Sequence, residues 1–279
     1  MVVNIERVAV LGSGSMGTAI LSGMLRAGFA PGAVSVSTKT QSSADRLADE
    51  LGVSTFALES DSNANAKTVA NADVVIVAVK PAYVTEVLAE VNESLKADAL
   101  IISVAAGVTI SSMQEVTRPD VAVIRSMPNT PAIVGRAVTG LAAGSRSHSG
   151  HLGIATQLFE TVGSVVVVDE SQIDELSTVS GSGPAYVFYL IEQFTAAAQS
   201  MGFDETTARL LVEQTFLGAS ELLAASGKSP AELRKQVTSP NGTTMRAIAE
   251  LEQANLQQLF EKATAAALAR AKEIAAGKG

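Results

Sequence analysis

The sequence of 279 residues contains no cysteine and no tryptophan, and aromatic residues make up only 4% of it. Without cysteine the chain can form no disulfide, no thiolate metal site and no thiol nucleophile. The core must therefore come from the aliphatic residues, which bring the hydrophobic share to 47%. The many alanines favour closely packed helices, because alanine loses no side-chain entropy on helix formation.

Positive charge is also scarce, and the net charge is −8 at pH 7. This balance argues against nucleic-acid or anionic-membrane binding, since both need basic patches. A small anionic substrate remains compatible with it, because a few local donors can dominate one pocket. The longest apolar runs, such as 74–79, have the length of a strand and not of a membrane span. The first residues lack the basic and apolar regions of a signal peptide, so we expect a soluble cytoplasmic protein.

Short β-branched runs alternate with helical patterns up to about residue 169. The runs are almost continuously hydrophobic, which is typical of parallel strands covered on both faces. The alternation of strand and helix predicts an α/β fold with a doubly wound sheet. The strands are expected at 7–11, 33–37, 73–79, 99–103, 121–125 and 165–168, and helices at 16–27, 42–51 and 82–95.

Strand patterns stop at about residue 170, and helical patterns separated by glycine and proline follow. We therefore expect two domains, a dinucleotide-binding domain at 1–169 and an all-α domain at 170–279. For a helical domain this small and this rich in alanine and leucine, we expect some apolar faces to stay unburied, and the hypothesis that follows is dimerisation through it. The helices are expected at 171–179, 184–201, 205–225, 230–237 and 243–276.

A glycine-rich segment directly follows the first apolar run and opens a helical pattern, which is the context in which GxGxxG binds a dinucleotide. The first glycine permits a tight turn, the second lets the pyrophosphate approach the backbone, and the third allows close packing of helix and strand. The free N–H groups of the helix favour phosphate. A glycine-rich turn without a ligand is the alternative. The segment is Gly12-Ser13-Gly14-Ser15-Met16-Gly17.

The end of the second expected strand carries no acidic residue. NAD-binding folds usually place Asp or Glu there, about 20 residues after the glycine motif, to bind the ribose 2′-OH. Here Ser37, Thr38 and Lys39 offer hydroxyls and a cation, which suit a 2′-phosphate. We expect NADPH to be favoured, with NADH as the less favoured cofactor. The alternative is that Lys39 is a solvated surface charge.

Two further strand ends belong to the carboxyl edge of the expected sheet, where ligands bind in open α/β folds. One is Ala78-Val79-Lys80-Pro81, and the other is the small-residue segment 103–107, which includes Ala106. Small side chains would let a nicotinamide ring lie against the backbone. Ordinary strand-to-helix turns explain either segment equally well.

A polar turn, Ser239-Pro240-Asn241-Gly242-Thr243-Thr244, precedes the last long helical pattern. The N–H groups and the dipole at the start of that helix can hold a small anion. Simple helix capping by the hydroxyl residues is the alternative. A cofactor motif near the start of the chain and an anion-binding turn near its end indicate a redox enzyme that acts on a small acid.

Two other charged features suggest structure and not chemistry. His148 and His151 lie in a polar segment without a carboxylate cluster, so we expect surface histidines and no metal site. Arg125 ends an expected strand, and we favour a structural role for it over one near the site.

Taken together, these motifs resemble those of the pyrroline-5-carboxylate reductase family over essentially the full length. Segments 125–131, 179–185 and 237–244 carry the specific part of the resemblance, whereas the glycine motif is shared by many dehydrogenases. The resemblance implies reduction of Δ1-pyrroline-5-carboxylate to L-proline with NAD(P)H, the last step of proline biosynthesis. It also implies a Rossmann-type domain followed by a helical domain that interleaves in a homodimer, and decamers built from dimers occur in the family.

The resemblance also assigns residues. Those at the cofactor are the glycine loop, Ser37, Asn65, Ala78, Val79, Lys80 and Ala106; those at the substrate carboxylate and ring nitrogen are Ser239, Gly242, Thr243 and Thr244. Thr244 matches the residue that hydrogen-bonds near the reacting nitrogen. The family often has two glycines after the proline of this turn, whereas here Asn241 comes first. Asparagine tolerates left-handed backbone angles, so the turn can survive.

Three alternatives stay open. Reductases of the 6-phosphogluconate or β-hydroxyacid dehydrogenase type usually carry a catalytic lysine on the first long helix of the second domain, and 184–201 contains none. An imine reductase for other ring sizes is not separable by sequence. A non-catalytic NADPH-binding protein would have the same scaffold, because fold alone does not prove function, but would not need the Thr243-Thr244 donors.

Overall fold

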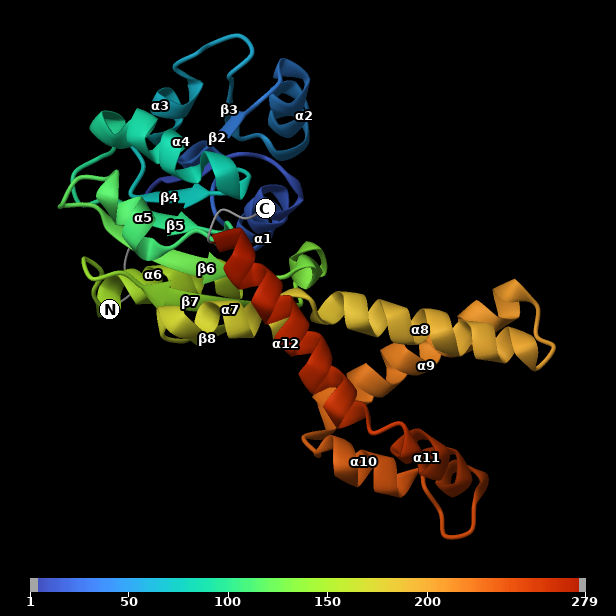
Figure 1. Cartoon of the computed structure of the whole chain (residues 1–279). Helices are drawn as coiled ribbons and strands as arrows, with labels where there is room; N and C mark the ends of the chain where they lie inside the picture. The colour runs from blue at the N-terminus through green and yellow to red at the C-terminus, as the bar shows by residue number, and fades with distance from the viewer. Residues whose placement is uncertain (1–4, 276–279) are drawn as a thin grey trace. The chain divides into compact units, whose positions relative to one another are not determined.

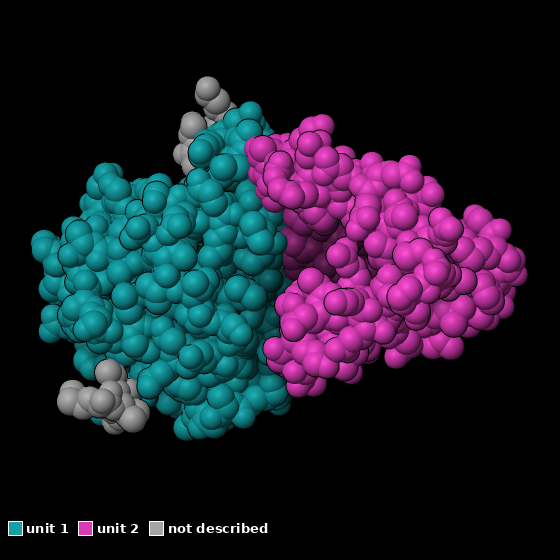
Figure 2. Space-filling model, turned by 90° about the horizontal axis from the view of Figure 1, so that it is seen from below, with its two compact units in different colours: residues 1–182, 267–279 teal, residues 183–266 magenta. Residues whose placement is uncertain are grey.

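An eight-stranded sheet is the centre of the larger of two structural units, and its strand order is β3-β2-β1-β4-β5-β6-β7-β8 (Figure 1). The computed structural model describes residues 5–275. Of these residues, 5–182 and 267–275 form the larger unit, and 183–266 form the other (Figure 2). The strands are β1 (Val8–Leu11), β2 (Val34–Thr38), β3 (Ser54–Ala57), β4 (Val74–Val77), β5 (Leu100–Ser103), β6 (Ala122–Met127), β7 (Ala137–Ala143) and β8 (Gly163–Val167).

Strands β1 to β6 are parallel, so their carboxyl ends meet at one edge of the sheet. Strand β7 runs antiparallel to β6, and β8 is parallel to β7. The carboxyl edge is where open α/β sheets bind their ligands. The expected fold class, a doubly wound α/β sheet followed by helices, is confirmed.

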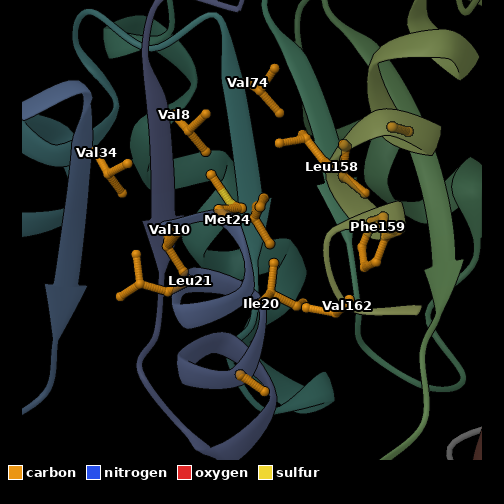
Figure 3. Close-up of a cluster of buried hydrophobic side chains, with 14 of the residues drawn as sticks. Val8, Val10, Ile20, Leu21, Met24, Val34, Val74, Leu158, Phe159 and Val162 are labelled. Carbon is orange, nitrogen blue, oxygen red and sulfur yellow. The ribbon is translucent and has the colours of Figure 1, made fainter. Parts of the chain in front are cut away.

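Helices cover both faces of the sheet, which explains why its strands are hydrophobic almost throughout. Along β1, Val8 and Val10 face one core, whereas Ala9 and Leu11 face the other. Burial of each large aliphatic side chain contributes about 1.5–3 kcal/mol of transfer free energy. Figure 3 shows the first core, to which β1 contributes Val8 and Val10 and the helices on this face contribute Ile20, Leu21, Met24, Leu158 and Phe159. The helices of this unit are α1 (Ser15–Arg26), α2 (Gln41–Leu51), α3 (Ala64–Val69), α4 (Val84–Val91), α5 (Ile110–Glu115), α6 (Ser149–Glu160) and α7 (Ile173–Leu176).

Two strands, β3 and β7, were not predicted from the sequence. Strand β3 reads Ser-Thr-Phe-Ala, and β7 consists mainly of alanine, glycine and threonine, so neither carries a strong strand pattern. Backbone pairing with β2 and with β6 and β8 holds them in the sheet. Tertiary context overrides intrinsic strand propensity in this way.

The second unit is helical. Its helices are α8 (Gly183–Ser200), α9 (Glu205–Ser226), α10 (Pro230–Gln236), α11 (Thr243–Gln253) and α12 (Leu256–Ala275), of which residues 267–275 belong to the larger unit. Asp204 caps α9 by accepting the Thr207 N–H at 3.0 Å. Ser229 and Glu232 form a capping box at the start of α10. Both devices satisfy N–H groups that a helix start leaves unpaired.

The long helix expected at 243–276 is two helices, and its last residue lies outside the described residues. The chain breaks at Asn255, whose φ of 46° is left-handed. Asparagine is among the few residues other than glycine that adopt this conformation readily. Within residues 5–275, none of the helices is long and apolar enough to cross a membrane.

Candidate functional site

The glycine loop between β1 and α1 packs closely against the chain's own backbone at Gly12 and Gly17 and is open at Gly14. Gly12 has a φ of 94°, and a Cβ added to it would lie 2.9 Å from the Ala78 carbonyl oxygen. A Cβ at Gly17 would lie 2.5 Å from the Gly12 carbonyl oxygen. A Cβ at Gly14 would meet nothing within 4 Å, so this residue faces open space.

Gly14 is also the N-cap of α1, so no cap side chain covers the first turn of that helix. Ser15 and Met16 open this helix, and Ser13 is fixed by the Thr18 hydroxyl, which donates to its carbonyl at 3.1 Å. An uncovered helix start with an approachable backbone fits the pyrophosphate of a dinucleotide.

The end of β4 lies beside the glycine loop. The Ala78 N–H donates to the Leu11 carbonyl at 2.8 Å, and the Val104 N–H donates to the Val77 carbonyl at 3.0 Å. The ends of β1, β4 and β5 are thereby tied together at the carboxyl edge. Ala78, Val79, Lys80 and Pro81 follow β4 at this edge, and Ala106 follows β5 and is exposed.

The end of β2 presents one exposed cation. Ser37 and Thr38 are buried, and the Thr38 hydroxyl donates to the Thr40 carbonyl at 2.9 Å, so it turns back to the chain. The Ser37 carbonyl accepts the Gly12 N–H at 3.1 Å, which joins this strand end to the glycine loop. Lys39 is exposed. Of the three side chains expected at a 2′-phosphate, Lys39 is therefore the one that is directed to solvent.

A carboxylate that sequence analysis missed reaches the same edge from another strand. Strand β3 pairs with β2, and the Glu59 N–H donates to the Lys39 carbonyl at 3.1 Å. The Glu59 Oε2 accepts the Gln41 N–H at 2.8 Å. Because β3 has no clear strand pattern, its end could not be placed next to that of β2 from the sequence.

Asn65 lies in α3 and is buried. Its Nδ2 donates to the Glu90 carboxylate of α4 at 3.2 Å. In this structure its amide group therefore links two helices.

The turn before α11 belongs to the helical unit. The Gly242 N–H donates to the Ser239 carbonyl at 3.0 Å, and Asn241 takes a left-handed φ of 60°. Gly242 is the N-cap of α11, so capping is not performed by the hydroxyls of Thr243 and Thr244. The glycine cap leaves the helix start uncovered by a cap side chain, which suits a small anion.

A cavity of about 400 Å³ lies between α10 and α11 in the helical unit, and none of the residues 239–244 is among those that line it. Arg234 and Lys235 bring positive charge to it, and Arg234 is 3.5 Å from the Glu252 carboxylate. The lining residues are Ala231, Arg234, Lys235, Thr238, Met245, Ile248, Ala249 and Glu252. The Ser239–Gly242 turn thus has cations close to it in the chain.

Asn129 joins two of the sequence motifs, 125–131 and 179–185. Its Nδ2 donates to the Ser180 carbonyl at 2.9 Å, and its Oδ1 accepts the Val138 N–H at 2.9 Å. Ser180 belongs to a π-helical turn, Ser177–Gly181. Such turns leave carbonyl groups without their usual helical partners and often occur at functional sites. Asn129 therefore fixes this turn to the carboxyl end of β6, a link that the sequence gave no sign of.

Arg125 has a structural role. Its side chain is only 4% exposed and donates to Asp174 at 2.5 Å, with Glu170 at 3.6 Å. It ties β6 to α7. His148 and His151 cap α6, with ring centroids 3.7 Å apart. Within the described part of the chain, no cluster of three or more His, Cys, Asp or Glu side chains could hold a metal ion.

Two family models match the chain. One is described as pyrroline-5-carboxylate reductase dimerisation and matches residues 170–274. The other is described as NADP oxidoreductase, coenzyme F420-dependent, and matches residues 7–107. The glycine loop lies in the second match, and the Ser239–Gly242 turn lies in the first.

Curated relatives match nearly the whole chain. Pyrroline-5-carboxylate reductase from Corynebacterium melassecola is 35% identical over 96% of this chain and 98% of its own length. The enzyme of that name from Pseudomonas aeruginosa is 36% identical over 96% of this chain and 97% of its own length.

Solved structures agree. A pyrroline-5-carboxylate reductase from Coxiella burnetii is 37% identical, with a TM-score of 0.91 over 97% of this chain and 98% of that one. A Plasmodium falciparum pyrroline carboxylate reductase solved with NADP bound is 24% identical, with a TM-score of 0.81 over 98% of both chains, and so shares the fold.

Proposed function

The chain belongs to the pyrroline-5-carboxylate reductase family of NAD(P)H-dependent oxidoreductases, and we propose that it reduces the C=N bond of Δ1-pyrroline-5-carboxylate to give L-proline. This reaction is the last step of proline biosynthesis. The observation that carries the proposal is the 35% identity, over nearly the full length, to an enzyme of this name, together with a glycine loop that fits a dinucleotide. We further propose that the enzyme works in the cytoplasm.

NADPH is the proposed preferred cofactor, with NADH used less well. Lys39 is exposed at the end of β2, and that strand end itself carries no acidic residue. A lysine there can pair with a 2′-phosphate, whereas NAD-specific folds usually place an acid at this position. When bound, the nicotinamide supplies the hydride, and the protein supplies position and electrostatics.

The proposed cofactor site consists of three parts. The Gly12–Gly17 loop holds the pyrophosphate, the adenosine end lies near Ser37, Thr38, Lys39 and Asn65, and the nicotinamide side is lined by Ala78, Val79, Lys80, Pro81 and Ala106. The support is that the strand ends carrying most of these residues are tied together by the backbone hydrogen bonds of Gly12, Ala78 and Val104.

The proposed substrate site is the turn before α11. Ser239, Gly242 and Thr243 hold the substrate carboxylate, with the help of the N–H groups and the dipole at the helix start. The imine carbon accepts hydride most easily when the ring nitrogen is protonated. The Thr244 hydroxyl hydrogen-bonds at this nitrogen, and because a threonine hydroxyl is a poor acid, its role is to orient the ring.

We propose residues 1–169 as the cofactor domain and residues 170–279 as the substrate and dimerisation domain. The support for dimerisation is the match of residues 170–274 to a dimerisation model, together with the apolar side chains that the helical unit exposes. A homodimer is the proposed unit, and a decamer is one assembly that dimers can build.

The test is an absorbance assay of NADPH oxidation with Δ1-pyrroline-5-carboxylate, repeated with NADH. We expect substrate-dependent turnover that yields proline, with a higher kcat/KM for NADPH. The same assay without the imine is the control. Demonstrated NADPH binding without turnover would contradict the proposed reaction and favour another imine or a non-catalytic role, and equal kcat/KM values would contradict the cofactor preference.

A further inference from the structure

At the edge proposed for the adenosine end, an exposed lysine and an exposed glutamate are neighbours along the backbone. Lys39 and Glu59 are 20 residues apart in the sequence, but the pairing of β2 with β3 places them on adjacent strand ends. The backbone hydrogen bond from the Glu59 N–H to the Lys39 carbonyl, at 3.1 Å, fixes this arrangement. Glu59 therefore belongs to the same local stretch of the edge as Lys39, which the proposed function assigns to the 2′-phosphate.

The carboxylate of Glu59 is held in place at the first residue of α2. Its Oε2 accepts the Gln41 N–H at 2.8 Å, and the next residue, Ser60, donates its hydroxyl to the Gln41 Oε1 at 2.6 Å. Glu59 and Ser60 thus hydrogen-bond to the backbone and to the side chain of Gln41, respectively. Glu59 is exposed, so its charge is open to solvent at this edge.

This arrangement has opposite consequences for the two cofactors. A 2′-phosphate carries about −1.5 to −2 charges near neutral pH, so it is attracted by Lys39 and repelled by Glu59. It could take the Gln41 N–H only if the carboxylate moved away. A ribose 2′-OH carries no charge and can donate a hydrogen bond to a carboxylate, which is how acids at this edge select NAD in related folds.

We propose that Glu59 is a specificity-determining residue that lowers the preference for NADPH which Lys39 creates. This inference rests on the proposed function, because it concerns the cofactor of the same site. It assigns the balance between the two cofactors to one lysine and one glutamate that come from different strands. Helix capping by Glu59 without influence on the cofactor is the alternative that the experiment separates.

The test compares wild type with Glu59→Gln, which removes the charge and keeps an amide oxygen for the Gln41 N–H. We expect the ratio of kcat/KM for NADPH to that for NADH to rise about tenfold, equivalent to about 1.4 kcal/mol. The KM for the imine should not change. Because the effect is electrostatic and exposed, it should shrink as salt is raised. Glu50→Gln is the matched control, since Glu50 lies at the other end of α2 and pairs with Arg46, and its ratio should stay at the wild-type value.

A second readout does not depend on turnover. Calorimetry measures the binding of adenosine 2′,5′-bisphosphate and of adenosine 5′-monophosphate to both proteins, and Glu59→Gln should tighten only the first, by about tenfold, as the same charge is removed. The proposal is overturned if Glu59→Gln matches wild type both in the ratio of kcat/KM values and in the ratio of the two nucleotide affinities. This holds even if the variant melts at a lower temperature, because Glu59 then only caps the helix. An enzyme without imine reductase activity would contradict the proposed function, and the nucleotide titration would still decide the role of Glu59.

Discussion

Thr244 is the single residue on which the proposed chemistry depends most. It is the second residue of α11, and Gly242 is the cap of that helix, so the Thr244 hydroxyl is not needed to begin the helix. We expect Thr244→Ala to lower kcat about 10²-fold, as does removal of one positioned hydrogen-bond donor in other active sites. The KM for NADPH should change little. Steady-state kinetics with both substrates measures this split.

A control variant separates chemistry from folding. Thr215→Ala removes a hydroxyl that donates only within α9, to the Leu211 carbonyl at 2.7 Å. The free energy of unfolding of both variants should lie within about 0.5 kcal/mol of the wild-type value, as is usual for substitutions that remove no core contact. Wild-type turnover of Thr244→Ala would remove Thr244 from the mechanism. A large loss of stability in that variant would make its lost activity a folding effect.

At the scale of the element, we expect the start of α6 to be pH-sensitive, because the His151 ring accepts a backbone hydrogen bond there. The His151 Nδ1 accepts the His148 N–H at 3.3 Å, and the His148 Nδ1 accepts the Gly150 N–H at 3.1 Å. Burial, and next the charge of His148, lower the pKa of His151 below 6.5, while Asp98 acts in the opposite direction. Protonation of His151 would remove the acceptor for the His148 N–H and place positive charge at a helix start, which the helix dipole disfavours.

The direction of the pH effect follows from this lowered pKa. Just below pH 6.5 the unfolded chain binds more protons at His151 than the folded chain, so stability falls as pH falls. The contribution is fully present above pH 6.5 and is lost as pH falls through the lowered folded pKa. Urea unfolding at about pH 7.5 and about pH 5.5 should show a larger drop for wild type than for His151→Gln. An equal drop in both proteins would show that His151 does not titrate in this window.

At the scale of the whole molecule, the helical unit has a small buried core and many exposed large apolar side chains. Its buried core consists of Ala198, Ala208 and Val212, with Ile191 and Phe216 packed against them. Large apolar side chains are exposed along α8, α9 and α12: Val187, Phe188, Tyr189, Leu190, Phe194, Leu210, Leu211, Leu217, Leu222, Leu223, Leu256, Leu259 and Phe260. Large exposed apolar side chains in such number on one small unit indicate an interface.

We therefore expect the wild-type protein to sediment as a dimer or a larger assembly. Phe188, which is 65% exposed, should contribute about 1.5–3 kcal/mol on burial, so Phe188→Asp should weaken association by roughly tenfold or more. Val134→Asp is the control, because Val134 is 72% exposed but lies outside the helical unit. Analytical ultracentrifugation over a dilution series measures both. A wild-type monomer at every concentration would contradict the expectation.

The sequence by itself determined the features that depend on neighbouring residues. The apolar run before Gly12 and the helical pattern after Gly17 predicted the strand, the loop and α1, because the required backbone angles and phosphate contacts are local. Alternating strand and helix patterns predicted the two-faced sheet, since hydrophobic periodicity reflects burial. The specific motifs at 125–131, 179–185 and 237–244 predicted the family. Sequence identity of 35% to one of its members, over 96% of this chain, confirmed it.

Only the tertiary structure decided the contacts between segments that are far apart in the chain. Strands β3 and β7 have weak patterns and exist because neighbouring strands supply their backbone partners. Glu59 reaches Gln41, and Asn129 reaches Ser180, through that same packing. The φ of Asn255 that divides α11 from α12 is likewise a choice among allowed conformations. These features depend on which surfaces meet, and a local sequence pattern carries no record of its distant partner.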